Sequence, residues 1–183
     1  MTEYRRLYVP EGMYFFTVVT HKRIDLFSNP SARVILRTAI SQVRKKWPFE
    51  ITAFVLLPNH LHTLWKLPQN DSDFSTRWRL VKDKFTQLYR QNNRSDVNLS
   101  DSRLKKGEKT FWQRRFWEHW IRNENDFKNH IDYIHYNPVK HGYVGKVKNW
   151  QWSTFHRYVK LGWYDEEWGS TEPVNVIQTC AGE

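Results

Sequence analysis

The chain has 183 residues, and its 29 Lys and Arg against 19 Asp and Glu give a formal net charge of +10, which points to an acidic partner such as nucleic acid. Its length suits one domain of roughly 100–200 residues, and it has no run of about 18 apolar residues, so we exclude a membrane-spanning helix. The single Cys180 cannot form an internal disulfide and the N-terminus has no secretory signal, so we expect a cytoplasmic protein.

The first third of the chain predicts a strand, a helix and a hairpin. Residues 13–20 (MYFFTVVT) are aromatic and β-branched and predict a short buried strand. Asn29 and Pro30 supply an N-cap and a first helical residue for an amphipathic helix that ends near Trp47. The segments FEITAFVLL and HLHTLWKL then flank a Pro-Asn turn dipeptide and predict a β-hairpin.

The rest of the chain predicts two more helices and one more strand. Asp71-Ser72-Asp73 can cap a strongly basic helix, and residues 91–109 are polar and predict a long loop. Residues 110–122 are aromatic and predict a strand, and residues 124–136 have helical spacing. The segment WQWSTFHRYVK predicts a short helix. We therefore expect one domain over residues 1–163 and a partly flexible tail over residues 164–183.

The order of these elements predicts the fold class. The order β-α-β-β-α-β with a further helix is typical of an α+β, ferredoxin-like fold. Such a fold has an antiparallel sheet with helices on one face, and its first and third strands are central. The elements after the fourth strand form a C-terminal extension.

Two pairs of polar residues could carry chemistry. His60 and His62 flank Leu61 on a predicted strand, so both rings face one side about 6–7 Å apart and could bind a divalent metal. Two histidines on the polar face of a sheet would give the same pattern. Tyr133 and Asn137 lie four residues apart on a predicted helix and can reach one site together. Tyr133 lies off the apolar stripe, so the core does not require it, although an amphipathic surface tyrosine would have the same position. Pro138 explains Asn137 equally well as a helix-ending residue.

Basic and aromatic side chains accompany these pairs. Contacts to phosphates and stacking on unpaired bases would use such side chains, although a solvated helix face or an aromatic core has the same composition. The predicted DNA-binding residues are Arg5, Arg6, Arg77, Arg79, Lys82, Arg114, Arg115, Lys140, His141 and Arg157.

Several motifs together resemble one family. They are EYRRLYVPEG, FEITAFVLLPNHLHTLW, DFSTRW, FWQRRFWEHWIRN, HIDYIHYNPVKHGYV and WSTFHRY, which span most of the chain. The sequence resembles the HUH-type single-tyrosine transposases, and within them the REP-associated tyrosine transposases, where REP stands for repetitive extragenic palindrome. The resemblance implies that His60, His62 and Asn137 hold a divalent metal, Mg²⁺ or Mn²⁺, and that Tyr133 is the nucleophile.

The resemblance also implies a function and a partner. It implies a monomeric, nucleoid-associated enzyme that cleaves and rejoins single-stranded DNA at REP-type hairpins through a 5′-phosphotyrosine. Two alternatives remain open from the sequence. One is a catalytically weak or inactive module that binds the hairpin, and the other is a ferredoxin-like RNA-binding module, which needs neither metal nor nucleophile.

Overall fold

The computed structural model describes residues 6–92 and 111–171. Its sheet has four antiparallel strands in the order β2-β3-β1-β4, so β1 and β3 are central as predicted. The strands are β1 (Met13–Val19), β2 (Glu50–Leu56), β3 (His60–Lys66) and β4 (Trp117–Trp120). The hairpin of β2 and β3 is confirmed. The last strand is much shorter than residues 110–122, and Trp112 forms only an isolated bridge with Thr20.

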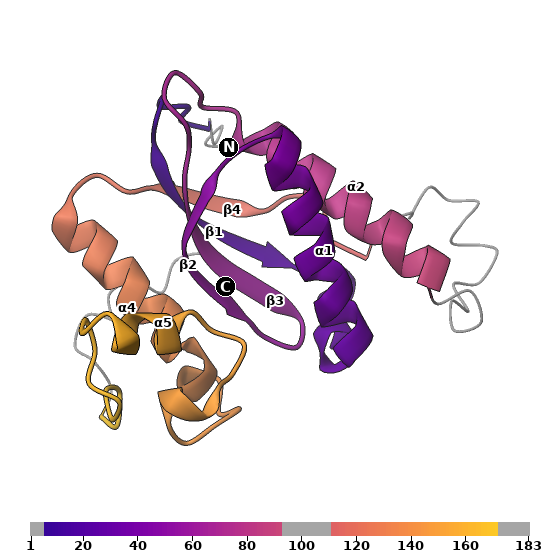
Figure 1. The fold of residues 1–183 in the computed structure, drawn as a ribbon. Helices are drawn as coiled ribbons and strands as arrows, with labels where there is room; N and C mark the ends of the chain where they lie inside the picture. The colour runs from indigo at the N-terminus through magenta and orange to yellow at the C-terminus, as the bar shows by residue number, and fades with distance from the viewer. Residues whose placement is uncertain (1–5, 93–110, 172–183) are drawn as a thin grey trace, which may run out of the picture.

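Helices cover both faces of the sheet (Figure 1). α1 (Pro30–Lys46) and α2 (Phe74–Asn92) lie on one face, whereas α4 (Glu124–Lys140) and α5 (Phe155–Lys160) lie on the other. The α+β class and the βαββαβ order are therefore confirmed. The expectation of helices on one face holds for α1 and α2 only, because the extension folds back over the opposite face. Three single-turn 3-10 helices are η1 (His21–Arg23), η2 (Leu26–Ser28) and η3 (Val147–Asn149).

The alternation of side chains along β1 separates two hydrophobic cores. Tyr14, Phe16 and Val18 belong to the core under α1 and α2, and Phe15 belongs to the core under α4 and α5. Side chains alternate between the faces of a strand, so a slip of one residue would exchange the two sets. The register of β1 therefore fixes which side chains face α4.

α4 is longer than predicted and is buried on more than one side. It runs to Lys140 and contains Pro138, and every residue from 130 to 138 is buried. The cause is a further layer: Tyr164 and Trp168 pack on the same core, and the Tyr164 hydroxyl donates to Asp132 Oδ1 at 2.6 Å. These contacts extend past the predicted boundary at residue 164. Residues 93–110 and 172–183, which hold most of the predicted loop and tail, lie outside the described residues.

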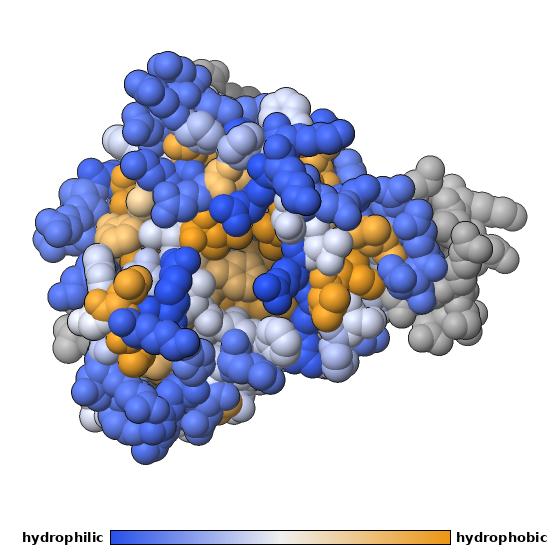
Figure 2. All heavy atoms as spheres, viewed as in Figure 1, coloured by the Kyte–Doolittle hydropathy of each residue, from blue (hydrophilic) through white to orange (hydrophobic). Residues whose placement is uncertain are grey.

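The outer edge of β2 is covered by a returning segment. The Leu56 N–H donates to the Trp152 carbonyl and the Thr154 N–H donates to the Phe54 carbonyl, both at 2.9 Å. These bonds use backbone groups that an exposed edge strand would offer to other chains. The surface seen in Figure 2 is mostly hydrophilic around an apolar hollow. Among the described helices, none is long and apolar enough to cross a membrane.

Candidate active site

Two histidines of β3 face α4 from the sheet. His60 and His62 have exposed fractions of 1% and 0%, and their ring centroids lie 4.9 Å apart. Leu61, between them, packs in the opposite core with α1 and α2. The predicted same-face arrangement of the two rings is therefore confirmed.

One nitrogen of each ring is held by a neighbouring side chain. His62 Nδ1 is hydrogen-bonded at 2.9 Å to Oγ1 of Thr17, the residue directly opposite on β1. His60 Nδ1 is hydrogen-bonded at 2.7 Å to Asn59 Oδ1. Metal-binding histidines in proteins are usually oriented in this way through their other nitrogen. Nε2 is then the nitrogen of each ring that would bind a metal. Neither Thr17 nor Asn59 was predicted from the sequence to belong to this site.

α4 brings the second predicted pair to these histidines. The Tyr133 ring lies 5.2 Å from the His62 ring, and the His141 ring lies 5.2 Å from the His60 ring. Tyr133, Asn137 and His141 follow at four-residue spacing on one helix face. Asn137, which is fully buried, therefore lies between two residues that contact the histidines. Two imidazoles and one amide oxygen are a donor set that fits a divalent ion such as Mn²⁺ or Mg²⁺.

Tyr133 is buried, contrary to the prediction that it lies off the core. Its exposed fraction is 1%, and its ring packs edge-on against Phe15 at 5.9 Å. The apolar stripe of one helix could not reveal that the sheet, through Phe15 and His62, also covers the side of α4 that carries Tyr133. Lys140, predicted as a DNA contact, has its Nζ 3.5 Å from the Tyr133 hydroxyl oxygen and 4.8 Å from the ring centroid. A lysine seven residues, or two turns, after the tyrosine lies on the same helix face. This spacing could have predicted that Lys140 lies near Tyr133.

Four of the predicted DNA-binding residues gather on the other face of the sheet. A pocket of about 600 Å³ lies between α2 and the segment before β4, and we call it the basic pocket. It is lined by Arg6, Arg79, Lys82 and Arg114 and by the rings of Trp78, Trp112 and Phe116. The Arg6 guanidinium lies 4.2 Å from the Phe116 ring centroid and pairs with Glu118 at 3.2 Å. Trp78 and Trp112 are each only 1% exposed, so Phe116, which is partly exposed, is the ring of this pocket on which an unpaired base could stack beside the cations.

Lys82 is the unusual member of the basic pocket. It is buried, and its Nζ donates to the Gln113 carbonyl at 3.0 Å. Burial, and to a smaller extent the charge of Arg6, lowers the pKa of Lys82 to about 8. A buried ammonium is costly unless paired, so this position favours an anionic partner.

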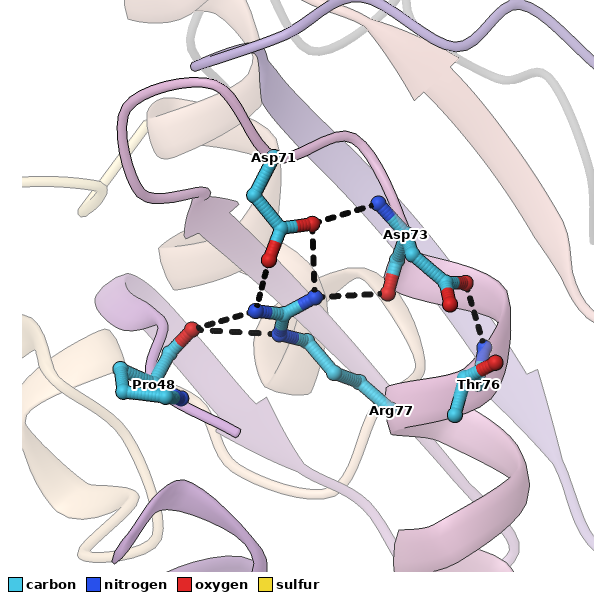
Figure 3. A network of polar contacts seen from close by, with 5 residues as sticks. All are labelled: Pro48, Asp71, Asp73, Thr76 and Arg77. Carbon is cyan, nitrogen blue, oxygen red and sulfur yellow. Dashed lines mark hydrogen bonds and ion pairs between the residues drawn. The ribbon is translucent and has the colours of Figure 1, made fainter. Parts of the chain in front are cut away.

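Arg77 is buried with its donors occupied, contrary to its prediction as a DNA-binding residue. Its exposed fraction is 1%, and Figure 3 shows its guanidinium enclosed by Asp71, Asp73 and Pro48. All five N–H donors are used: two bonds go to the Pro48 carbonyl, two to the Asp71 carboxylate and one to the Asp73 carbonyl. Arg77 instead ties the start of α2 to the chain before β2.

The remaining basic residues are scattered. Arg115 is exposed, and Arg157 donates to the Thr52 carbonyl and lies 5.3 Å from the Tyr158 ring centroid. Arg5 lies outside the described residues. The structure therefore divides the predicted DNA contacts between the basic pocket, the surroundings of Tyr133 and unrelated positions.

Comparisons with known proteins identify the family of this chain. The family model described as "Transposase IS200 like" matches residues 8–137. A REP-associated tyrosine transposase of Escherichia coli (strain K12) is 44% identical over 100% of this chain and 98% of its own. A relative from Haemophilus influenzae, also named as a REP-associated tyrosine transposase, is 42% identical over 96% of this chain and 98% of its own. A solved structure of a REP-associated tyrosine transposase bound to a REP hairpin has a TM-score of 0.77 and 42% identity, with 100% and 98% of the two chains covered.

Proposed function

Because the chain belongs to the IS200-like transposases, and within them to the REP-associated tyrosine transposases that cut and rejoin DNA, we propose that it cleaves single-stranded DNA beside REP-type hairpins through a covalent bond to Tyr133. The observation that carries the proposal is the convergence of two pairs from distant elements. The Tyr133 ring lies 5.2 Å from the His62 ring, and His60 is 4.9 Å further along β3.

The chemistry follows from the groups around the tyrosine. A phenol with a pKa of about 10 is a poor nucleophile at neutral pH unless nearby positive charge stabilises its anion. Lys140 Nζ, 3.5 Å from the hydroxyl oxygen, provides such a charge. A divalent ion held by His60, His62 and Asn137 would act as a Lewis acid toward the scissile phosphate.

Cleavage and joining are the same step in opposite directions. The Tyr133 hydroxyl loses its proton to solvent as its oxygen forms a bond to phosphorus. The bond from phosphorus to the 3′ oxygen breaks, and that oxygen takes up a proton and leaves as a 3′-hydroxyl. The product is a 5′-phosphotyrosine. Because this bond conserves the energy of the phosphodiester, a 3′-hydroxyl can attack it and rejoin DNA without ATP.

The basic pocket supports single-stranded DNA as the substrate. Its cations and the partly exposed Phe116 ring suit a phosphate and an unpaired base. Cleaving a stacked duplex would also require extracting the strand, at a cost of a few kcal/mol. All residues of the candidate site come from one chain, so we propose that a monomer is active.

The test is covalent adduct formation with a labelled REP-type hairpin that carries a single-stranded flank, in Mn²⁺ or Mg²⁺. Tyr133→Phe should keep hairpin binding and abolish the adduct. Tyr143→Phe, which changes an exposed tyrosine close to α4, should leave the adduct level unchanged. Annealing a complementary strand to the flank should also abolish the adduct.

Three outcomes would contradict the proposal. A normal adduct level with Tyr133→Phe would show that Tyr133 is not the nucleophile. Equal cleavage of the duplex would show that the substrate need not be single-stranded. Tight hairpin binding by the unmodified chain with no adduct in either metal would favour an inactive hairpin-binding module.

A further inference from the structure

A second group of metal-binding side chains lies apart from His60 and His62. His119 on β4 and Asp126 and His130 on α4 each offer a ligand atom, and these atoms all lie within 4.8 Å of one another. The Phe15 ring separates this group from the candidate active site, because it lies 4.8 Å from the His130 ring and 5.5 Å from the His62 ring. We propose that His119, Asp126 and His130 bind a Zn²⁺ ion at a second site.

The distances between the donors favour one shared ion. His119 Nε2 lies 2.9 and 3.0 Å from the two Asp126 carboxylate oxygens, and His130 Nδ1 lies 3.0 Å from Asp126 Oδ1. In a tetrahedral zinc site with bonds of about 2.0–2.1 Å, neighbouring ligand atoms are about 3.3 Å apart. Each histidine nitrogen needs to move only a few tenths of an ångström away from the carboxylate. The two rings stack with centroids 4.6 Å apart and planes 16° apart, so one ring must also rotate for both nitrogens to point at the ion.

The donor set and its surroundings favour zinc over Mg²⁺. Two imidazoles and one carboxylate with a fourth position open are typical of zinc sites, whereas Mg²⁺ prefers oxygen ligands. The Arg122 N–H donates to Asp126 Oδ2 at 3.0 Å and fixes the carboxylate, as residues around a metal site usually do. His119 and Asp126 are partly exposed, with side-chain fractions of 25% and 18%, so an ion can enter from solvent.

Binding requires one change of protonation. His130 Nδ1 lies 2.8 Å from the Asp126 carbonyl, so without metal this nitrogen carries the hydrogen. Burial lowers the pKa of His130, which keeps the ring neutral, and the hydrogen can move to Nε2 when Nδ1 binds the ion. The bound ion would join the four residues of β4 to the first turns of α4, the helix that carries Tyr133.

The test uses the full chain with His60→Ala and His62→Ala, which removes the first site, after metal removal with EDTA. Titration with Co²⁺ should give the strong visible absorption of a tetrahedral site at one equivalent, and Zn²⁺ should displace it and raise the melting temperature. Adding Asp126→Asn should weaken Co²⁺ and Zn²⁺ binding at least about tenfold, since loss of an outer-shell partner alone costs 10–100-fold. Adding His119→Gln as well should abolish it.

A matched control is His156→Ala in the same background, because His156 is an exposed histidine of α5 outside this group. It should leave the absorption and the stoichiometry unchanged. Circular dichroism of each variant would verify that it is folded. The proposal would be overturned if the chain with His60→Ala and His62→Ala gave no tetrahedral absorption, or if binding stayed equal after Asp126→Asn and His119→Gln. The three side chains would then form a hydrogen-bonded group that binds no metal.

Discussion

Lys82 should give DNA binding a pH dependence whose size follows from its burial. Its pKa is lowered to about 8, chiefly by burial, and a phosphate in the basic pocket would favour the charged ammonium and raise that pKa again. DNA binding should then take up a proton above pH 8. By linkage, the affinity should fall as the pH rises through this range.

The expected change between pH 7 and pH 9 is about tenfold. An amine with a pKa of about 8 is about 91% protonated at pH 7 and about 9% protonated at pH 9. If DNA binds only the protonated form, the affinity should change by this ratio of about tenfold, which corresponds to about 1.4 kcal/mol. Fluorescence anisotropy with a labelled single-stranded oligonucleotide at constant ionic strength would measure it. Lys82→Met keeps the alkyl stem and should remove most of the pH dependence. Lys84→Met removes a charge from the same helix and should weaken binding while keeping the slope.

The Lys82→Met variant should also separate the effect of Lys82 on DNA binding from its effect on the stability of the fold. The folded-state pKa of Lys82 lies below the unfolded value of 10.5, so its charge costs stability below about pH 8, and this cost disappears as the pH rises toward 10.5. At pH 7 the cost is at most about 3 kcal/mol, from (10.5 − 8) × 1.36. Lys82→Met should remove this cost and thereby raise the free energy of unfolding. The gain should be reduced by about 1–3 kcal/mol, because the substitution leaves the Gln113 carbonyl without a donor. An unmodified chain whose affinity is flat from pH 7 to pH 9, or a Lys82→Met variant that keeps the slope, would refute this reasoning.

Two further substitutions test the rest of the site and the fold. Replacing both His60 and His62 by Ala should abolish metal-dependent cleavage in the adduct assay and leave hairpin affinity within about twofold, and retained cleavage would remove the metal site from the proposed function. Arg77→Leu should lower the free energy of unfolding by about 3–5 kcal/mol in urea at pH 7, since it leaves buried acceptors without a donor, whereas the exposed Arg79→Leu should change it by at most about 0.5 kcal/mol. The hydrogen bond from Arg77 lowers the pKa of Asp71. The Arg77–Asp71 pair therefore contributes its full stabilisation above about pH 4 and loses it at lower pH, as Asp71 becomes protonated. The difference in free energy of unfolding between Arg77→Leu and the unmodified chain should shrink at low pH.

The parts of the fold that depend on local pattern were predictable. Asn29 does cap α1, where its side chain accepts from the Ser31 N–H at 2.9 Å. The period of two along β3 placed His60 and His62 on one side, because a strand allows no other arrangement. Both results follow from backbone geometry that a short stretch of sequence determines.

The errors arose where distant segments decide burial. Arg77 lies on the basic side of its helix, yet Asp71 and the Pro48 carbonyl enclose it, and helical periodicity cannot reveal that contact. Tyr133 lies off the apolar stripe of α4 but is buried against the sheet, where its ring meets Phe15 of β1 and His62 of β3. The family resemblance predicts Tyr133 as the nucleophile, which stays a prediction, whereas the expectation that the core does not need this tyrosine was wrong.

The two faces of the sheet should have separable kinetic roles. The basic pocket lies beside α2, whereas Tyr133 and Lys140 lie on the α4 side, so the two groups meet the DNA at different points. Changing Arg79 and Arg114 together to Ala should weaken binding and reduce the slope of log K against log salt by about 1.4, since each phosphate contact on a single strand contributes about 0.7. The single-turnover cleavage rate at saturating DNA should stay unchanged, because no group near the reacting phosphate is lost.

Lys140→Met should behave in the opposite way. It removes the charge 3.5 Å from the Tyr133 hydroxyl oxygen, so the saturated rate should fall at least about a hundredfold, the lower end of what one electrostatic group supplies to a reaction. The affinity should change little. Quench-flow measurement of the adduct at several DNA concentrations separates the two quantities. If the Arg79 and Arg114 variant lost as much saturated rate as Lys140→Met, the pocket would act in the chemical step and the division between the faces would be wrong.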